Sequence, residues 1–503
     1  METTQQTTSN YRKIVSSTVI FGGAQAVNLI MNAVRGKLVA FLLSSTGMGI
    51  MSLLQNAANT IQQLSLLGIN ISAVRHISQV DKDGQEEVLS ASVKIVRILI
   101  FATSCLGLLF TLAFSPLMSK ISFGTMDYIS AFLLLSLAVF FNVMSSGEMA
   151  VMQGLRRYKQ LAFCSIVPAI CGLLISIPIY YFWGVQGIVP AMILSGAIYY
   201  AAIRYYSYRE PSHLKKPRPS FHTIWTEGQE IIQFGLVMTF GTVVGAITTY
   251  ALTAFVSNVG SVSDVGFYQA ANFITMQYIS MIFTAMATDF YPRLSALILR
   301  KAEAHQLVNQ QTEVVLFIVT PLSLLMILTA PLLITVLLTN EFQSIRTIVY
   351  FMGLASIFKA LCFPMDYIAY AKGDKKYIMW IETIWGNAKT FSVIALFYYF
   401  FGLNGLGYGA LCSAVIDVIV SIILTRLRYD FSLSAPVFRL LAVMLTLAAV
   451  CFMATFISST ILSYTIMSLA TGSCIGYSLI GLNRRLDFKA ILQRFRAKGN
   501  VSS

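Results

Sequence analysis

Long apolar stretches are the feature that most constrains this chain. A helix that spans a membrane needs about 20 predominantly apolar residues. Stretches of that kind lie near residues 14–34, 48–69, 93–114, 127–149, 161–182, 185–206, 229–257, 266–290, 313–337, 346–370, 378–400, 405–425, 438–458 and 460–482. Because a chain in lipid must satisfy its backbone hydrogen bonds internally, each stretch is expected to be helical. We predict an all-α polytopic membrane protein with about fourteen transmembrane helices.

Composition excludes the soluble classes of protein. Apolar residues make up 56% of the chain and charged residues 11%, whereas soluble domains carry about 25% charged residues. The seven cysteines all fall inside predicted helices without CxxC spacing, so neither a disulfide framework nor a zinc site is indicated. The chain lacks P-loop, HExxH, GxSxG and GxGxxG motifs. We therefore predict no catalytic residues, no metal and no cofactor.

The basic residues indicate how the chain is oriented. Cytosolic loops of membrane proteins are enriched in Lys and Arg, and most of the 35 Lys and Arg residues fall in alternate loops that are cytosolic if the N-terminus is cytosolic. The exceptions are Arg35, Lys37, Lys120 and Arg346 outside, and Lys359 and Lys389 within helices. We predict that both termini are cytosolic in a bacterial inner membrane. The net charge of +14 then faces anionic lipid, and no nucleic-acid partner is expected.

One phrase of the sequence occurs twice. Residues 154–158 read Gly-Leu-Arg-Arg-Tyr and lead to the Gly-Val-Gln-Gly of residues 184–187. About 218 residues later, residues 373–377 read Gly-Asp-Lys-Lys-Tyr and lead to the Gly-Leu-Asn-Gly of residues 402–405. We interpret each first phrase as a cytosolic elbow between two hairpins, with glycine at the turn. Such self-similarity predicts two homologous halves, and in a membrane it favours a transporter whose site lies at the seam between them.

The repeat also divides the chain. Residues 208–228 contain three prolines and a run of basic residues, which cannot continue a helix. We predict an N-terminal lobe of six helices at 1–207, a cytosolic linker at 208–228, a C-terminal lobe of six helices at 229–428, and two further helices with a basic cytosolic tail at 429–503.

Polar residues inside the predicted helices mark a candidate cavity. They recur at steps of three and four residues, which places them on one helical face. The stripes are Gln25, Asn28, Asn32 and Arg35 on the first helix, Gln55, Asn59 and Gln62 on the second, and Gln269 and Asn272 on the eighth. Polar groups are costly in hydrocarbon, so these stripes either hydrogen-bond between helices or line a hydrated cavity, and we favour the cavity.

Three arginines could contribute to this cavity. Arg35 lies at the predicted outer end of the first helix, where it either snorkels to the headgroups or points inward as an anion ligand. A guanidinium suits phosphate because its planar fork binds two oxygens and stays protonated. Arg75 and Arg293 follow Gly49 and Gly266 at equivalent repeat positions. They are either positive-inside anchors or residues at the mouth of the cavity.

Six ionisable residues lie within the other predicted helices: Glu148, Lys359, Asp366, Glu382, Lys389 and Asp417. Lys359 and Asp366 are seven residues apart on one helix, as are Glu382 and Lys389. This spacing is roughly 10.5 Å along the helix axis, too far for the two side chains to pair directly. We expect Lys359 to pair with Glu382, and Lys389 with Asp366 or Asp417, across neighbouring helices. These groups are either structural ion pairs or a site for a coupling H⁺ or Na⁺.

Several motifs resemble one known family. They are Arg35-Gly36-Lys37-Leu38, residues 47–55, Leu67-Gly68-Ile69 with Ala73-Val74-Arg75, and the spacing Gly154, Tyr158, Gly184, Gly187. Together they resemble the O-antigen translocases, the Wzx-type lipid-linked oligosaccharide flippases of the multidrug/oligosaccharidyl-lipid/polysaccharide exporter superfamily.

That resemblance implies two six-helix lobes, alternating access, and an undecaprenyl-pyrophosphate-linked glycan as cargo. Lipopolysaccharide or other surface-polysaccharide biosynthesis would be the pathway, and a polymerase of the same glycan would be a partner. Related lipid II flippases also have two extra C-terminal helices and essential cavity arginines. Arg35 stands where a first-helix arginine would, although the seventh helix has no counterpart.

Three alternatives stay open. A multidrug exporter of the same superfamily would favour an aromatic, acidic cavity for cations, whereas the charge on the first polar stripe is Arg35. A membrane glycosyltransferase or polymerase needs outside loops with catalytic groups, and the predicted outside loops are short. An assembly scaffold would not need buried polar stripes.

Overall fold

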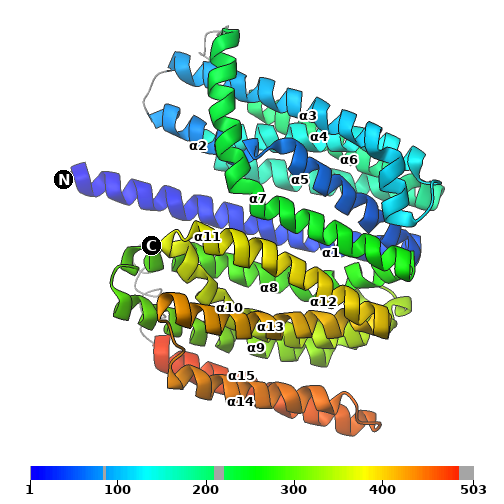
Figure 1. Cartoon of the computed structure of the whole chain (residues 1–503), viewed down its shortest axis with the longest axis vertical. Helices are drawn as coiled ribbons and strands as arrows, with labels where there is room; N and C mark the ends of the chain where they lie inside the picture. The colour runs from blue at the N-terminus through cyan, green and yellow to red at the C-terminus, as the bar shows by residue number, and fades with distance from the viewer. Residues whose placement is uncertain (1, 83–85, 209–219, 487–503) are drawn as a thin grey trace, which may run out of the picture. The chain divides into compact units, whose positions relative to one another are not determined.

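The computed structural model describes residues 2–82, 86–208 and 220–486, and every element in this part is helical (Figure 1). Most of the predicted linker and the tail after residue 486 lie outside it. The α-helices are α1 Glu2–Leu66, α2 Ile69–Lys82, α3 Glu86–Phe123, α4 Ile129–Gly154, α5 Tyr158–Trp183, α6 Ile188–Tyr208, α7 Phe221–Val259, α8 Val262–Leu297, α9 Lys301–Leu337, α10 Arg346–Lys372, α11 Lys375–Tyr377, α12 Gly386–Phe401, α13 Leu403–Tyr429, α14 Ala435–Ala454 and α15 Thr460–Leu486. Two 3₁₀ segments, η1 Gly184–Gly187 and η2 Asn340–Ile345, and one π-helix, η3 Ile378–Trp385, connect them.

The predicted all-α polytopic fold is confirmed. Each of the apolar stretches has a helical counterpart, and 10 helices of the described part are long and apolar enough to cross a membrane. One boundary was wrong. The sequence predicted a loop between the first two spans, but α1 stays helical through residues 35–43. It breaks at Ser44, where φ is 56°.

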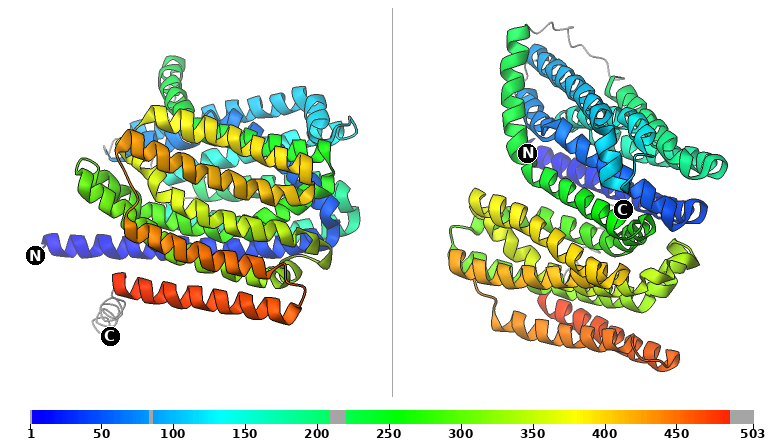
Figure 2. Two further views of the ribbon diagram at one scale, coloured as in Figure 1. Left: turned by 60° about the horizontal axis from the view of Figure 1, so that its bottom comes forward. Right: turned by 45° about the vertical axis from the view of Figure 1, so that its right-hand side comes forward.

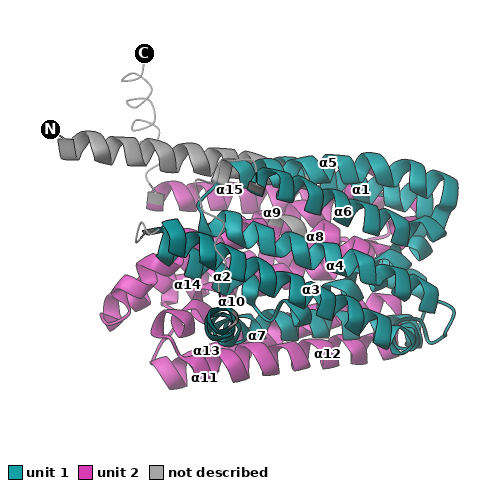
Figure 3. Cartoon of the chain, turned by 90° about the horizontal axis from the view of Figure 1, so that it is seen from above, with its two compact units in different colours: residues 1–267, 337–339 teal, residues 268–336, 340–503 magenta. Residues whose placement is uncertain are grey.

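The helices pack into two compact units (Figure 3). One contains residues 1–267 with 337–339, and the other contains residues 268–336 with 340–503. These units do not coincide with the predicted repeat lobes, because α7 packs against α1, α2 and α3. The lobe boundaries read from the sequence therefore stay a prediction.

Each unit has its own buried apolar contacts. In the first, Ile100, Val151 and Ile231 belong to one cluster that joins α3, α4 and α7. In the second, Phe290 and Met444 belong to a cluster that joins α8 and α14 with α9, α10, α13 and α15. The helices α14 and α15 lie side by side as a hairpin (Figure 2). In lipid such contacts stabilise the fold through close packing rather than through exclusion of water.

The repeated phrase builds the same turn in both units. Gly184 has a φ of 52° and Gly402 a φ of 57°, and both cap the C-terminus of the preceding helix. Three residues later, a Cβ on Gly187 or Gly405 would lie 2.8 or 2.1 Å from a carbonyl oxygen of that helix. Glycine is therefore required for conformation at one position and for close approach at the other.

The two elbows differ in how they turn. In the second copy Gly373 adopts the left-handed conformation with a φ of 64°, as expected. In the first copy the left-handed residue is Arg156, with a φ of 54°. Gly154 instead ends α4, where a Cβ would lie 2.8 Å from Ile77. The prediction that glycine makes both turns was therefore wrong for the first copy.

An ion pair fixes the second elbow. Arg428 donates from Nε and Nη2 to Asp374 at 2.5 and 2.9 Å, and the Tyr429 hydroxyl donates to the same carboxylate at 2.9 Å. The hydrogen bonds from Arg428, followed in effect by those from Tyr377 and Tyr429, lower the pKa of Asp374 to about 2. The contact therefore stabilises the fold at neutral pH and is lost as the pH falls from about 4 towards 2.

Two repeat-related glycines meet where the chain turns from one span to the next. A Cβ on Gly49 would lie 1.9 Å from the backbone oxygen of Val262, and a Cβ on Gly266 would lie 2.0 Å from that of Ser45. Each glycine thus contacts the residue that is four positions before the other. Such reciprocal contacts are those of a two-fold axis.

A hydrogen bond lies at the centre of this glycine contact. The Thr46 Oγ1 and Ser263 Oγ atoms are 2.7 Å apart, and the two residues are separated by 217 positions. That separation is the repeat spacing, so the bond joins equivalent residues of the two repeats.

Substitution of Gly49 tests the close approach. Gly49→Ala should lower the stability by about 1–3 kcal/mol, because the backbone of Val262 cannot move away as a side chain would. Thermal unfolding of the purified protein in detergent measures this loss. Gly476→Ala is the matched control, since nothing lies within 4 Å of its Cβ position. Equal midpoints for the two variants would contradict the packing argument.

Candidate functional site

Arg35 lies inside a spanning helix rather than at its end. Residues 36–43 separate it from the break at Ser44, an axial rise of about 13 Å at 1.5 Å per residue. Its side chain is half-buried, and its Nε is buried without a hydrogen-bond partner among the described residues. A guanidinium held in this way is available to bind an anion.

The other residues of the first stripe surround Arg35 in sequence. Asn32 is exposed and Asn28 is half-buried. The side chain of Gln25 lies outside the described residues. Lys37, beside Arg35, is exposed. The described part of the stripe therefore presents amides and one guanidinium along a helix that is otherwise apolar enough to span a membrane.

In the second stripe, in the later half of α1, some side chains contact neighbouring helices and others are exposed. Gln55 and Asn59 are exposed. Asn56 donates to Thr253 of α7 at 3.4 Å, so it serves helix packing. Gln62 donates to Ser146 of α4 at 2.9 Å. Gln55 and Asn59 are thus the members placed to meet a hydrated ligand, whereas Gln62 contacts a neighbouring helix.

The candidate residues of α8, and Arg75 of α2, make more contacts with neighbouring side chains. Gln269 and Asn272 are half-buried, and Asn272 hydrogen-bonds the buried Tyr268. Arg293 is exposed and donates to Asp289 at 2.9 Å. In the first unit, Arg75 is exposed and stacks on the Phe234 ring at 4.4 Å. Neither Arg75 nor Arg293 has the buried, unpartnered nitrogen that distinguishes Arg35.

Glu148 is enclosed by two arginines, Arg97 and Arg204, that lie near the ends of the predicted spans 93–114 and 185–206. Its carboxylate accepts hydrogen bonds from Arg97 at 3.1 Å, Arg204 at 2.8 Å and Ser207 at 2.8 Å. The Glu148 side chain is 3% exposed. This contact ties α3, α4 and α6 together, and both lone-pair regions of the carboxylate are occupied. The position of Arg97 four residues inside a predicted span was the signal for this contact.

In the second unit, the buried Lys389 forms an ion pair with Asp417, whose side chain is partly exposed. The Lys389 ammonium contacts the Asp417 carboxylate and donates to the Ser413 carbonyl at 3.1 Å. Asp417 was one of the two partners expected for Lys389. Lys359 is exposed, and its charged neighbours are Asp417 and Lys389. The expected pair of Lys359 with Glu382 is therefore wrong, because Lys359 lies beside the Lys389–Asp417 pair instead.

The described hydrogen bonds of two carboxyl groups in the second unit, Asp366 and Glu382, come from the hydroxyl groups of Ser421 and Tyr370 rather than from cationic side chains. Asp366 accepts a hydrogen bond from Ser421 at 3.0 Å, and its strongest charged neighbour is Glu382. Glu382 lies within η3 and has a buried Oε1 with no hydrogen-bond partner in the described part. Tyr370 hydrogen-bonds the Glu382 side chain. π-helical turns are rare and are frequently found at functional sites. Two close carboxyl groups can share a proton or hold a small cation.

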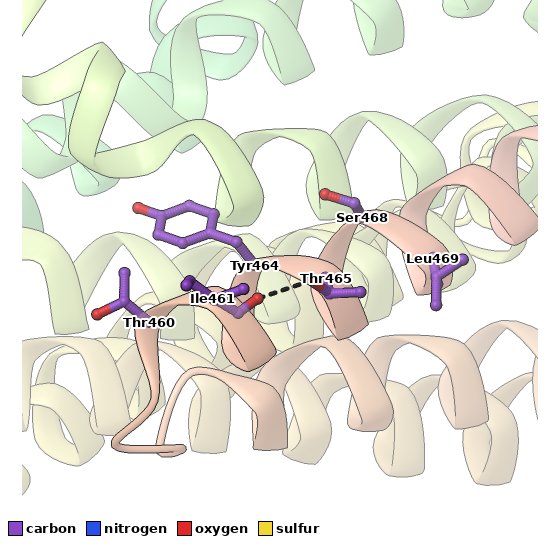
Figure 4. Close-up of a pocket in the computed structure, with 6 residues that line it drawn as sticks. All are labelled: Thr460, Ile461, Tyr464, Thr465, Ser468 and Leu469. Atoms are coloured by element: carbon purple, nitrogen blue, oxygen red, sulfur yellow. Dashed lines mark hydrogen bonds between the residues drawn. The ribbon is translucent and has the colours of Figure 1, made fainter.

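A separate hollow of about 610 Å³ lies beside α15 (Figure 4). Six residues of this single helix line it, among them Ile461 and Leu469, which are 82% and 66% exposed. The lining contains no charged side chain. An open, mostly apolar surface of this kind suits lipid rather than a charged headgroup.

Removing the Glu148 carboxylate tests the three-helix contact. Glu148→Gln should cost about 3 kcal/mol, because two guanidinium groups lose their counter-charge. Thermal unfolding in detergent measures this cost. Glu303→Gln is the matched control, since that carboxylate pairs with Arg300 on an exposed surface. A stability loss no larger than that of the control would show that the contact is not structural.

The comparisons with known proteins agree with this architecture. The chain matches the family described as polysaccharide biosynthesis protein (Polysacc_synt_3) over residues 38–347. No curated protein sequence matches it.

Solved structures of membrane transporters share the fold. A lipid II flippase MurJ in an inward closed conformation is 12% identical, with a TM-score of 0.64, over 94% of this chain and 99% of that chain. An inward-facing multidrug resistance MATE transporter of the MOP superfamily is 16% identical, with a TM-score of 0.65, over 82% of this chain and 98% of that chain. A MOP superfamily transporter from Pyrococcus furiosus is 16% identical, with a TM-score of 0.58, over 82% and 95%. The chain belongs to the polysaccharide biosynthesis protein family and has the fold of MOP-superfamily transporters.

Proposed function

We propose that this protein flips an undecaprenyl-pyrophosphate-linked oligosaccharide from the cytoplasmic to the periplasmic leaflet of a bacterial inner membrane. The cargo would be the repeat unit of O-antigen or of a similar surface glycan. Both chain ends would be cytosolic, and a polymerase of the same glycan would receive the product. The family match to polysaccharide biosynthesis proteins and the fold shared with a lipid II flippase support this proposal.

The observation that carries the proposal is the Nε of Arg35, which is buried without a hydrogen-bond partner among the described residues. A buried guanidinium nitrogen without a partner is costly, so its retention within a span favours a ligand that supplies acceptors. Pyrophosphate offers several anionic oxygens in the geometry that a guanidinium fork binds. Exposed Asn32, Gln55 and Asn59 on the same long helix can hydrogen-bond sugar hydroxyls, because an amide both donates and accepts.

Transport would proceed by alternating access. The headgroup would enter the polar region from the cytosol while the polyprenyl chain stays in lipid. Outward movement of the anionic headgroup is favoured by an inside-negative potential, at about 2.3 kcal/mol per charge per 100 mV. In the predicted orientation, the symmetric Thr46–Ser263 contact lies on the periplasmic side, so it must open before the headgroup can leave.

Asp366 and Glu382 are the candidate coupling site. Glu148 and Asp417 are each paired with cationic side chains, whereas the strongest charged neighbour of Asp366 is Glu382. Binding a proton or Na⁺ would relieve the repulsion between them. Its inward release would then return the empty carrier to its starting state.

Replacing Arg35 tests the anion site. Arg35→Ala should reduce glycan delivery to the periplasm at least tenfold with unchanged protein abundance, because the pyrophosphate loses its fork. Arg35→Lys should retain part of the activity, since the charge remains and the fork does not. Arg346→Ala is the control, because that exposed arginine pairs with Gln343. Full delivery by Arg35→Ala would eliminate the anion role.

A reversible cross-link tests alternating access. In a background without the native cysteines, Thr46→Cys with Ser263→Cys should form a disulfide that stops delivery, and reduction should restore it. Ser323→Cys with Ser356→Cys is the matched control, because those hydroxyls are also 2.7 Å apart but join α9 and α10, which both belong to the predicted C-terminal lobe. Undiminished delivery by the oxidised Thr46/Ser263 variant would contradict the mechanism.

Neutralising Asp366 tests ion coupling. In proteoliposomes, a gradient of H⁺ or of Na⁺ should accelerate the flipping of a polyprenyl-pyrophosphate-linked sugar by the wild type. Asp366→Asn should remove that acceleration, whereas Asp289→Asn, at an exposed ion pair, should keep it. Retained acceleration in Asp366→Asn would place the coupling site elsewhere.

A multidrug exporter is the alternative, and the Asp366–Glu382 pair is the observation that favours it. Acidic groups within a span can bind cationic drugs. Efflux of a cationic dye from cells separates the two functions, because a flippase for an anionic headgroup should leave dye accumulation unchanged. Dye efflux that depends on Asp366 would favour the exporter.

A further inference from the structure

The first unit contains a pocket that none of the polar stripes predicted. Its volume is about 380 Å³, within the usual range for small-molecule sites. Residues of α2, α4 and α6 line it, so three separately packed helices shape its walls.

The lining of this pocket is polar but uncharged. It contains two amides, Asn70 and Gln153, and two hydroxyls, Ser146 and Tyr199. The rest of the wall is apolar. Amides and hydroxyls donate and accept hydrogen bonds, and apolar side chains suit the C–H faces of a sugar ring. The combination matches a neutral carbohydrate.

One polar atom in the lining lacks a partner. The Oδ1 atom of Asn70 is buried and accepts no hydrogen bond from the part of the chain that the structure describes. A buried acceptor left in this state costs about 1–3 kcal/mol. A hydroxyl donor on a bound molecule would remove that cost.

A neighbouring contact connects the pocket to the proposed transport path. Ser146 accepts a hydrogen bond from Gln62 at 2.9 Å and donates to the Asn142 carbonyl at 3.0 Å. Its hydroxyl is therefore fixed in orientation. Gln62 belongs to the same stripe of α1 as the exposed Gln55 and Asn59, so the pocket adjoins that helix.

The charges nearby do not fit an ionic ligand. Glu148 is on α4 beside the lining residues, but its carboxylate is already occupied by Arg97 and Arg204. The lining itself has neither a carboxylate for a cationic drug nor an arginine or lysine for a phosphate.

We propose that this pocket binds one neutral sugar residue, a hexose or N-acetylhexosamine, of the transported glycan. The inference rests on the proposed function and deepens it. Arg35 would hold the pyrophosphate, and Asn70 and Gln153 would select the sugar. The pocket would thus determine which glycan is accepted.

Saturation-transfer NMR on the full chain in nanodiscs tests this assignment. The probes are methyl glycosides of glucose, galactose, mannose and N-acetylglucosamine. At least one should receive saturation from the wild type. Asn70→Ala should weaken its binding about fivefold to tenfold, as expected for one hydrogen bond. Gln153→Trp should abolish it, because Gln153 is exposed and an indole there fills the pocket without displacing core residues.

Thr465→Trp, at the hollow beside α15, is the matched control and should bind the glycosides as the wild type does. Equal saturation transfer to a glycoside from the wild type and from Gln153→Trp would overturn the assignment. The absence of transfer to every glycoside would also overturn it.

Glycan delivery in cells separates this inference from the proposed function. Gln153→Trp should reduce delivery at least tenfold at normal abundance. Normal delivery by Gln153→Trp together with loss in Arg35→Ala would refute the sugar pocket and leave the flippase function standing. Normal delivery in cells that lack the protein would refute the function itself, whatever the pocket binds.

Discussion

The cost of an unsatisfied polar group in apolar surroundings governs this structure. It makes every described element helical, since a helix pairs its own backbone groups. It explains why Glu148 is enclosed by Arg97 and Arg204, and why Lys389 is held against Asp417. Eleven buried side-chain atoms of the described residues have no hydrogen-bond partner, and such an atom suggests a ligand contact only where the neighbouring groups also fit a ligand.

Three of these buried atoms without a partner lie at the three proposed sites. The Nε of Arg35, the Oε1 of Glu382 and the Oδ1 of Asn70 are all buried without a partner in the described chain. They differ in chemistry as the sites do: a cation for an anionic headgroup, a carboxylate for a coupling ion, and an amide for a sugar. The proposed transport of a lipid-linked glycan would use all three kinds of group.

The sequence predicted what depends on local pattern. Apolar runs predicted the helices, and the repeat predicted that Gly184 and Gly402 are equivalent residues, which the structure shows in matched turns. It did not predict contacts between helices. The partners of Glu148 and the isolation of Lys359 from Glu382 depend on how helices are rotated against each other, which periodicity alone does not determine. The position of Arg35 was missed because residues 35–43, with Gly36 and two charged residues at their start, were predicted to form a loop, whereas α1 stays helical through them.

The most direct test of the central claim is leaflet-resolved accumulation of the lipid-linked glycan. Cells that lack this protein should accumulate undecaprenyl-pyrophosphate-linked repeat units on the cytosolic face of the inner membrane, and expression of the wild type should move them to the periplasmic face. Repeat units that reach the periplasmic face at the normal rate without the protein would contradict the account.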